Sequence, residues 1–375
     1  MTTLLVVAGE ASGDLHGAEL LQALKARRPD LRIIGVGGDR MAPHMDRMLA
    51  HVRDIGVVGF IEVIKHLPQL NRLFKQVLAA VEEEDAQAAL FIDYPGFNLR
   101  LAKALREQRP AMKLAQYVCP QVWAWKKGRI PDLGKTLDVL YCLFDFEPAL
   151  FKGFPVEAKW VGNPLVEAVK PEVDRNTFLA ETGLDGSRRL VALLPGSRSS
   201  EVTRLLPPMA ELVRAWAKQR PEVQWVLPVA PTLDAAFLKR FTGDLPVKLV
   251  EHRSYAARAY ADAALVASGT ATLETALLGT PFAIVYKLNA LTAFAAKRLV
   301  KLPRVGLANI VAGREVAPEL LQGEVNPDRL SAVLSLLFDP AEAARRRQLL
   351  ATVRPHLGEP GAADRVATDL IARLP

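Results

Sequence analysis

The chain has 375 residues, of which 50% are hydrophobic and 24% charged, values that are ordinary for a globular α/β protein with two domains. No apolar run approaches the roughly 20 residues that a membrane-spanning helix needs. The first residues lead directly into an apolar run, without the basic segment of a signal peptide. The net charge of +7 favours an anionic partner: a nucleic acid, an anionic membrane surface or a phosphorylated substrate.

The first half of the chain alternates between short apolar runs and segments with helical spacing. The first run, at residues 4–8, is followed by a glycine loop and a predicted helix that reaches residue 25. Further strands are predicted at 31–36, 88–92, 113–118, 137–143 and 156–161. Strands that alternate with helices indicate a parallel sheet with helices on both faces.

The loop after the first strand, in the sequence VAGEASGDLHG, contains Glu10, Ser12 and Asp14. Its glycines do not match the G-x-G-x-x-G pattern of dinucleotide-binding loops, and two carboxylates would repel a pyrophosphate. Carboxylates and a hydroxyl suit sugar hydroxyls, so the loop is predicted to hold a sugar. A structural alternative stays open, in which Asp14 caps the helix and Glu10 is solvated.

Residues 55–78 carry apolar side chains at helical spacing, interrupted by Pro68 and flanked by Lys65, Arg72 and Lys75. Such a helix can lie in a membrane interface, with its apolar face in the acyl boundary and its cations near anionic headgroups. A core helix that packs on the first sheet is equally compatible with the pattern. The positions predicted to contact acyl chains or the bilayer are Val57, Phe60, Ile61, Ile64 and Leu67.

Asp93 follows a wholly apolar strand and begins the segment DYPGFN. A carboxylate at the C-terminal edge of a parallel sheet is placed to take a proton from an acceptor hydroxyl, so Asp93 is a candidate general base. An aspartate before a turn can also simply accept hydrogen bonds from local backbone N–H groups. Spacing alone does not separate the two interpretations.

No metal site is predicted. The acidic residues of the segment Asp145-Phe146-Glu147 superficially resemble a D-x-D metal motif, but the segment lacks a second acidic cluster and is flanked by aromatic residues. The six histidines are scattered, and the only two cysteines, Cys119 and Cys142, are expected to be free thiols because their spacing is unlike that of metal ligands. Residues 123–129 mix aromatic side chains with cations, a pattern found in single-strand nucleic-acid binders and equally in sugar-binding platforms.

The second half repeats the alternation of strands and helices. Strands are predicted at 190–194, 223–228, 247–249, 263–267 and 282–286, and the chain is helical and basic from 341 onward. Two of these strands lead through glycine loops into helices: LLPGSRSSE near 194 and VASGTATLE near 267. At such junctions, backbone N–H groups and the helix dipole converge on an anion.

These two junctions predict a nucleotide site. Arg198 adds a planar fork of donors for phosphate oxygens, and Glu274, one turn into its helix, can accept both hydroxyls of a ribose. The alternatives are an ordinary strand-to-helix turn for the first loop and stabilisation of the helix dipole for Glu274. The predicted nucleotide-binding residues in these loops are Gly196, Ser197, Arg198, Ser268, Gly269, Thr270 and Glu274.

Seven motifs in order, VAGEASGDLHG, GVGGDRM, IDYPGFNLRLAK, PQVWAWKKGR, LLPGSRSSEV, SGTATLE and NIVAGRE, resemble the lipid-A-disaccharide synthase family. The resemblance implies a GT-B glycosyltransferase that needs no metal and no other cofactor. Its implied reaction moves 2,3-diacylglucosamine from UDP-2,3-diacylglucosamine to 2,3-diacylglucosamine 1-phosphate (lipid X). The products are a β-1′,6-linked disaccharide and UDP, so the anomeric carbon is inverted. It also implies a peripheral position on the cytoplasmic face of the inner membrane.

The resemblance assigns roles to particular residues. Asp93 matches the family's essential aspartate, Arg198 its UDP-contacting arginine, and Glu274 and Asn309 further nucleotide-side positions. Glu10, Ser12 and Asp14 match the family's N-terminal loop. Three positions depart from the pattern: Asn163 replaces the usual His, Cys119 the usual Ser, and Asp145 stands where Pro is common.

The predicted architecture is α/β, with two Rossmann-like parallel-sheet domains of GT-B type that face each other across a cleft. Residues 1–165 would form the acceptor- and lipid-binding domain, 166–340 the UDP-sugar-binding domain, and 341–375 a helical segment able to pack back on the first domain. The expected partners are UDP-diacylglucosamine, lipid X, the anionic inner-membrane surface and, in a homodimer, a second copy of the chain. The alternatives are a UDP-sugar epimerase, another GT-B glycosyltransferase and, disfavoured by dispersed cations, a nucleic-acid-binding module.

Overall fold

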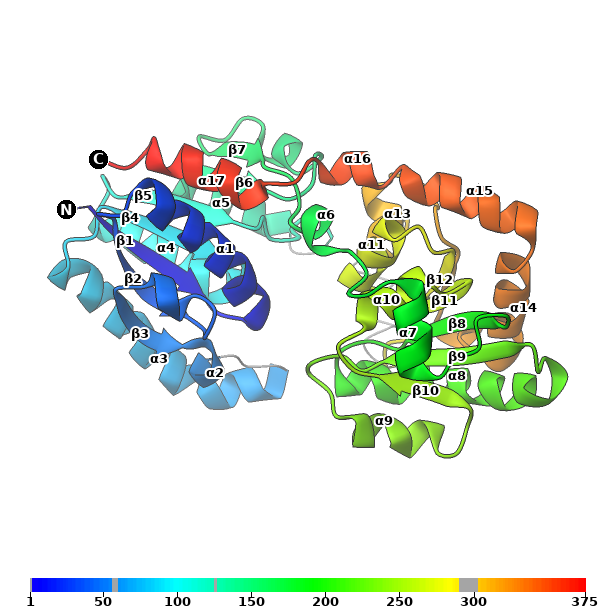
Figure 1. The fold of residues 1–375 in the computed structure, drawn as a ribbon. Coiled ribbons are helices and arrows are strands. Elements are labelled where there is room, and N and C mark those ends of the chain that lie inside the picture. The colour runs from blue at the N-terminus through cyan, green and yellow to red at the C-terminus, as the bar shows by residue number, and fades with distance from the viewer. Residues whose placement is uncertain (1, 56–59, 125–126, 290–302) are drawn as a thin grey trace. The chain divides into compact units, whose positions relative to one another are not determined.

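A computed structural model describes residues 2–55, 60–124, 127–289 and 303–375, without the side chains of residues 11, 54, 55 and 60–66. The chain forms two compact units, each built on one sheet (Figure 1). The first unit contains Met1–Pro164 and Leu357–Pro375, and the second contains Leu165–His356. No helix among the described residues is long and apolar enough to cross a membrane.

The first unit has a seven-stranded parallel sheet in the order β3-β2-β1-β4-β5-β6-β7. The strands are β1 (Thr3–Ala8), β2 (Arg32–Gly37), β3 (Arg47–His51), β4 (Ala88–Ile92), β5 (Lys113–Tyr117), β6 (Val139–Cys142) and β7 (Glu157–Trp160). The central strands β1 and β4 are continuous apolar runs because both of their faces are buried. The strand order reverses between β1 and β4, which places the switch point of the sheet there.

Helices cover both faces of this sheet. They are α1 (Ala11–Arg27), α2 (Val52–Ile55), α3 (Phe60–Glu83), α4 (Pro95–Gln108), α5 (Ile130–Thr136) and α17 (Ala362–Ile371). One core cluster joins α1 and α17, which lie side by side (Figure 1), to one face of the sheet. Another joins α3, α4 and α5 to the opposite face. The helix predicted at 55–78 thus begins at Phe60, continues through Pro68 and ends at Glu83.

The C-terminal helix α17 is attached to the first unit by Asp369. Its carboxylate accepts hydrogen bonds from the Tyr141 hydroxyl at 2.8 Å, from Arg373 Nε at 2.7 Å and from the Lys159 ammonium. Burial acts to raise the pKa of Asp369, but the hydrogen bonds from Arg373, Lys159 and Tyr141 outweigh it and lower the pKa to about 2. The carboxylate therefore stabilises the folded state in its charged form.

Asp369→Asn is expected to destabilise the protein at neutral pH and to matter little in strong acid. The folded pKa of about 2 lies below the ordinary value of 3.8, so the stabilisation is complete above pH 4 and is lost as the pH falls through 2. The shift corresponds to about 2 kcal/mol, which solvent screening of this partly exposed group reduces to about 1 kcal/mol. Urea unfolding of the wild type and of Asp369→Asn at pH 7 and at pH 2.5 measures the difference in their free energies of unfolding. A difference of equal size at both pH values would contradict a stabilising role for the charged Asp369 carboxylate.

The second unit has a six-stranded parallel sheet in the order β10-β9-β8-β11-β12-β13. The strands are β8 (Arg189–Leu194), β9 (Val223–Pro228), β10 (Val247–Val250), β11 (Ala263–Ala267), β12 (Phe282–Tyr286) and β13 (Glu319–Leu321). The helices include α6 (Leu165–Ala168), α7 (Arg175–Thr182), α8 (Ser199–Gln219), α9 (Ala235–Thr242), α10 (Ser254–Ala259), α11 (Thr270–Leu277), α13 (Leu307–Val311), α14 (Pro327–Leu337) and α15 (Pro340–Ala351). Here the strand order reverses between β8 and β11.

The predicted α/β architecture with parallel sheets is confirmed, and a strand lies at every predicted position. Two short edge strands were not predicted: β3, whose five residues are only half-buried, and β13, which has three residues. The helical segment predicted from 341 onward is divided between the units. Helix α15 belongs to the second unit, the chain leaves that unit within α16 (Arg354–Leu357), and α17 belongs to the first.

Candidate functional site

A pocket of about 810 Å³ lies in the second unit, at the C-terminal edge of its sheet. The loops after β8 and β11 line it, on either side of the switch point, where ligands bind in open α/β sheets. Seven of the eight predicted nucleotide-side residues contribute to the lining: Gly196, Ser197, Arg198, Ser268, Gly269, Thr270 and Glu274. The structure therefore brings the two predicted loops together around one pocket.

The loop after β8 already holds an anionic oxygen. Oε2 of Glu201, in the first turn of α8, accepts hydrogen bonds from the backbone N–H groups of Ser197 at 3.1 Å and Arg198 at 3.4 Å. The guanidinium of Arg198 contacts Glu201 Oε1 at 3.0 Å, and its side chain is 66% exposed. Gly196 has a φ of 114°, which only glycine adopts without strain. These donors converge as an oxyanion requires.

Glu274 is fixed by two side chains that the sequence did not single out. Arg258 donates to Glu274 Oε2 at 2.6 Å, and the Tyr255 hydroxyl donates to Oε1 at 3.3 Å. Arg258 is buried and is itself held by the carbonyl and hydroxyl oxygens of Ser254, both at 3.0 Å. Burial, and then the charge of Glu274, raise the pKa of Tyr255 to about 12. The Glu274 carboxylate is therefore held in one orientation at the pocket wall.

Asn309, the eighth predicted nucleotide-side residue, does not line this pocket. It is fully buried on α13, and its amide nitrogen donates to the Ala317 carbonyl and to Glu319 Oε1, both at 2.8 Å. Its oxygen accepts from the backbone N–H groups of Val316 at 2.7 Å and Ala317 at 3.0 Å. These four hydrogen bonds use the whole amide, so Asn309 joins α13 to the start of β13 and has no donor left for a nucleotide.

Asp93 lies at the switch point of the first sheet, directly after β4. Asp93 and Tyr94 have φ values of 49° and 48°, two consecutive non-glycine residues in the left-handed region. Asn98 and Gln116 hold this turn by donating to the Asp93 carbonyl at 2.8 Å and 3.2 Å. The Ser12 hydroxyl, from the loop after β1, lies 3.4 Å from Asp93 Oδ2. Strained backbone that the surroundings enforce is typical of functional sites.

His16 is a further group near Asp93 that was not assigned a role from the sequence. Burial lowers its pKa, while the charge of Asp93 acts in the opposite direction. Its Nδ1 atom is buried without a hydrogen-bond partner among the described residues. The imidazole therefore lies close enough to Asp93 for the charge of that residue to act on it.

Asp14 has a different role from both predicted ones. Its carboxylate accepts hydrogen bonds from the backbone N–H groups of Gly38 at 2.7 Å, Met41 at 3.1 Å and Arg40 at 3.2 Å. It therefore neither faces a sugar nor caps α1, but holds the turn after β2. A Cβ atom on Gly38 would lie 2.5 Å from Asp14 Oδ2, which explains the glycine there. Glu10, at the N-cap of α1, is exposed.

The predicted membrane-contacting positions fall mainly outside the described part of the chain. Val57 is outside the described residues, and so are the side chains of Phe60, Ile61 and Ile64. Leu67 on α3 is described and is 44% exposed. Farther along α3, Leu73, Val77 and Val81 are buried against the first sheet. The C-terminal part of this helix is thus a core helix, and the membrane role of its first turns stays a prediction.

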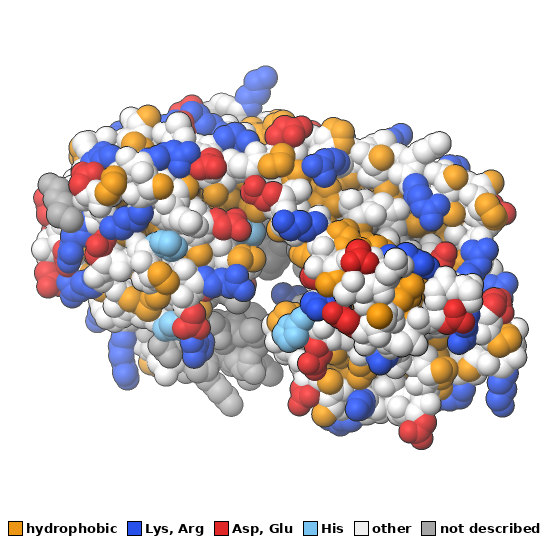
Figure 2. Space-filling view, in the orientation of Figure 1, with side chains coloured by type: hydrophobic (Ala, Val, Ile, Leu, Met, Phe, Trp, Pro, Cys, Tyr) orange, Lys and Arg blue, Asp and Glu red, His pale blue; other side chains and the backbone are white. Residues whose placement is uncertain are grey.

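The aromatic segment at 123–129 does not present Trp123 as a stacking platform. Its indole is buried and packs edge-on against Phe146, with ring centroids 5.4 Å apart, and its N–H donates to Glu147 at 3.1 Å. Residues 125–126 lie outside the described part of the chain. On the described surface that Figure 2 shows, Lys and Arg side chains are interspersed with acidic ones on each unit, unlike the continuous stripe of a nucleic-acid binder.

A model of the lipid-A-disaccharide synthetase family matches residues 4–363. The chain belongs to this family. The lipid-A-disaccharide synthase of Myxococcus xanthus is 41% identical over 377 aligned residues, covering 99% of this chain and 97% of the relative. That of Geobacter sulfurreducens is 39% identical over 375 residues, again covering 99% and 97%.

Two solved structures have folds similar to that of this member of the lipid-A-disaccharide synthase family. The glycosyltransferase of kitacinnamycin is 19% identical, with a TM-score of 0.66 and coverage of 100% of this chain and 99% of that one. The UDP-GlcNAc 2-epimerase from Neisseria meningitidis, bound to UDP-GlcNAc, is 11% identical, with a TM-score of 0.63 and coverage of 99% and 100%. At these identities the likeness concerns the fold alone, and it confirms the predicted GT-B class.

Proposed function

We propose that the chain transfers 2,3-diacylglucosamine from UDP-2,3-diacylglucosamine to lipid X, giving the β-1′,6-linked disaccharide 1-phosphate and UDP. Family membership over nearly the whole chain carries this proposal. The clustering of seven predicted donor-site residues around one pocket of the second unit supports it independently. In this proposal the second unit binds the UDP-sugar and the first supplies the acceptor side.

The pocket chemistry fits a nucleoside diphosphate. The N–H groups of Ser197 and Arg198, which contact Glu201 here, and the first N–H groups of α11 would bind the phosphates, with the Arg198 guanidinium beside them. Each Glu274 oxygen accepts one hydrogen bond and keeps a further lone pair, so the carboxylate can accept ribose hydroxyls. Arg258 would then act as a positioning residue that keeps the Glu274 carboxylate oriented.

Asp93 would accept the proton of the attacking acceptor hydroxyl. A single inverting displacement needs a base on the acceptor side and stabilisation of negative charge on the leaving diphosphate. Asp93 supplies the first, while Arg198 and the loop N–H groups supply the second. The test is to mix purified protein, UDP-diacylglucosamine and lipid X and to measure disaccharide and UDP. Release of UDP without disaccharide, or epimerisation of the donor without lipid X, would contradict the proposal.

Turnover is expected to survive treatment with EDTA, because the charge of the leaving diphosphate is stabilised by Arg198 and by backbone dipoles. Three of the four carboxylates that line the pocket already have partners: Glu201 contacts Arg198, Glu274 contacts Arg258, and Glu172 accepts from the backbone N–H groups at 255 and 256. The fourth, Glu251, is exposed. UDP release with and without EDTA measures the effect. Loss of turnover that Mg²⁺ or Mn²⁺ restores would show that a divalent cation takes part in the transfer.

We also propose that the first turns of α3 contact acyl chains or an anionic inner-membrane surface. Leu67 is among the few large hydrophobic side chains that are exposed in the described part of the chain. Leu67→Ser should reduce binding to anionic vesicles roughly fivefold, because partial burial of one leucine contributes about 1 kcal/mol. Its melting temperature should not change. Leu336→Ser, at a 49% exposed position on α14, is the matched control. Equal vesicle binding by both variants would count against the membrane role.

A further inference from the structure

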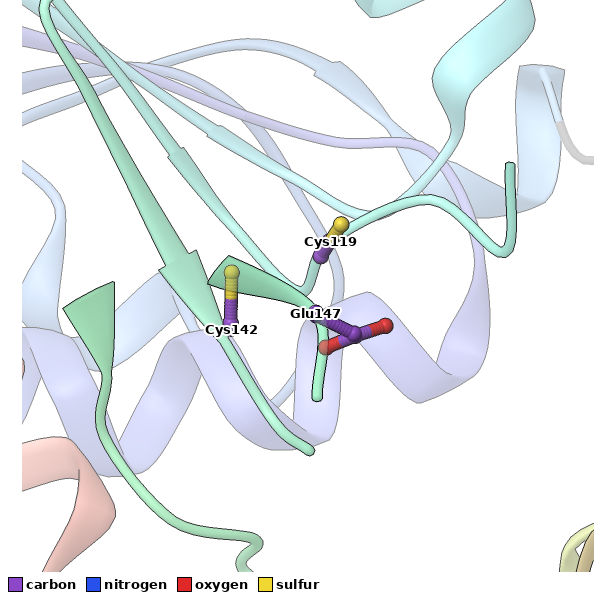
Figure 3. Close-up of side chains that lie close together, drawn as sticks. All are labelled: Cys119, Cys142 and Glu147. Carbon is purple, nitrogen blue, oxygen red and sulfur yellow. The ribbon is translucent and has the colours of Figure 1, made fainter. Parts of the chain in front are cut away.

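Two thiols and a carboxylate come together in the first unit, outside the residues assigned to transfer. They belong to Cys119, Cys142 and Glu147, which are drawn in Figure 3. One sulfur from each cysteine and one oxygen from the carboxylate all lie within 4.8 Å of one another. The three residues are 3%, 0% and 1% exposed. Each thiol donates only a weak hydrogen bond to a backbone carbonyl, Cys119 to Pro120 at 3.4 Å and Cys142 to Leu140 at 3.7 Å. Two sulfurs and a carboxylate in one buried place are the donor types that bind a transition metal.

The fold brings these residues together through neighbouring strands. β5 and β6 pair in parallel, with Tyr117 opposite Tyr141, so the segments that follow them meet at the same edge of the sheet. Cys142 ends β6, and Cys119 lies two residues after β5. Between β5 and Cys119, Val118 has a φ of 70°, a conformation that is strained for a β-branched residue. The strained residue Val118 directly precedes Cys119 in the chain.

Glu147 is held in place by three donors. Its Oε2 accepts hydrogen bonds from the backbone N–H groups of Leu143 at 3.0 Å and Phe144 at 3.1 Å. Its Oε1 accepts from the indole N–H of Trp123 at 3.1 Å. Carboxylates that bind metals are typically oriented by such outer hydrogen bonds.

We propose that Cys119, Cys142 and Glu147 form a Zn²⁺ site. Zn²⁺ binds cysteine sulfur at about 2.3 Å and carboxylate oxygen at about 2.0–2.2 Å, so the ligand atoms of one ion lie roughly 3.5–4 Å from one another. The ligand atoms of this cluster all lie within 4.8 Å of one another, so a small adjustment brings them to that distance. Two thiolates are too soft for Mg²⁺ or Ca²⁺, and the carboxylate is too hard for Cu(I). Each thiol releases one proton to solvent on binding, so at least two protons leave per ion bound. A fourth position is left for water or a backbone carbonyl.

The site would join two loops beside the turn of Asp93. Gln116, in β5, donates to the Asp93 carbonyl at 3.2 Å and to the Val118 carbonyl at 3.3 Å. The backbone N–H of Asp93 donates to the Tyr117 carbonyl at 3.1 Å. A cation on Cys119 would therefore tie the end of β5, which supports this turn, to the loop at 143–147. Its role is structural, and it takes no part in the transfer step.

The test uses the reduced, full-length protein after chelation and dialysis. Added Co²⁺ should bind at one ion per chain and give a thiolate-to-metal charge-transfer absorption. Zn²⁺ should displace the Co²⁺. Zn²⁺ added to the metal-free protein should raise the melting temperature and release at least two protons per ion, one from each thiol. Cys119→Ser and Cys142→Ser should each remove at least half of the thiolate absorption, and Glu147→Gln should weaken binding by about tenfold or more. Asp145→Asn changes an exposed carboxylate of the same loop and is the matched control that should bind normally.

Several outcomes would overturn the site. One is reduced, folded wild-type protein that shows neither Co²⁺ absorption nor a Zn²⁺-dependent melting shift. Another is a Cys119–Cys142 disulfide, seen as a mass lower by two hydrogens, that re-forms in the presence of Zn²⁺. If the cysteine variants do not fold, alkylation of the wild-type thiols decides, because Zn²⁺ must slow it. An alkylation rate that is the same with and without Zn²⁺ would contradict the proposed site. None of these readouts depends on glycosyl transfer, so this proposal and the proposed function can fail separately.

Discussion

Asp93→Asn is expected to lower turnover by about 10²–10⁴-fold, the usual contribution of a general base, without changing the fold or the affinity for UDP. Asparagine has the same size and tolerates the left-handed conformation that Asp93 adopts, so the turn should persist. The hydrogen bonds that hold the turn are made by the backbone carbonyl of Asp93, which the substitution does not alter. The loss should therefore reflect the missing proton acceptor.

Ser12→Ala is the matched comparison for this variant. The Ser12 hydroxyl lies 3.4 Å from Asp93 Oδ2, at the long end of hydrogen-bond distances, so it orients the carboxylate only weakly. Its removal should cost far less than loss of the carboxylate. Turnover with UDP-diacylglucosamine and lipid X is measured for both variants, together with UDP binding and melting temperature. Near-normal turnover in Asp93→Asn would remove Asp93 from the mechanism.

The sequence predicted the sheets because their central strands are continuous apolar runs that end at glycine or polar turns. β4 and β11 are fully buried on both faces, so every residue in them carries the signal. The edge strand β3 does not carry this signal, since RMLAH is half-buried and has a polar side chain at each end. The strand order places the loops after β1 and β4 at the switch point of the first sheet and those after β8 and β11 at the switch point of the second. These loops could therefore be predicted from the sequence without knowledge of any contact between distant residues.

Contacts between distant segments were not predictable in the same way. Asp14 reaches backbone N–H groups 24 to 27 residues away, and nothing in VAGEASGDLHG indicates that the turn after β2 comes to it. Arg258 occupies an alanine-rich helix, where a buried arginine is unexpected until its partner Glu274 is placed on the neighbouring helix. Cys119 and Cys142 lie at the ends of two predicted strands. Their proximity could have been expected only once those strands were known to be neighbours.

Arg198→Ala is the second variant with a large expected effect, a fall in turnover of about 10²–10³-fold, as for loss of one preorganised donor to developing negative charge. The guanidinium is 66% exposed and its ion pair with Glu201 spans 3.0 Å. Such an exposed pair contributes at most about 1 kcal/mol to stability, so the melting temperature should scarcely change. Any large loss of activity must then come from the reaction and not from the fold.

The split between kcat and KM identifies what Arg198 does. If it stabilises the departing diphosphate, kcat and kcat/KM should fall together, whereas a donor that binds the ground state equally well would raise KM alone. Arg204→Ala, three residues after Glu201 on the same helix, is the matched control, because Arg204 donates to the Ser200 carbonyl at 2.8 Å and does not line the pocket. Equal effects of the two variants would mean that net positive charge matters and the position of Arg198 does not. A rise in KM at constant kcat would assign the stabilisation of the leaving group to other donors that line the pocket, among them the backbone N–H groups of the two loops.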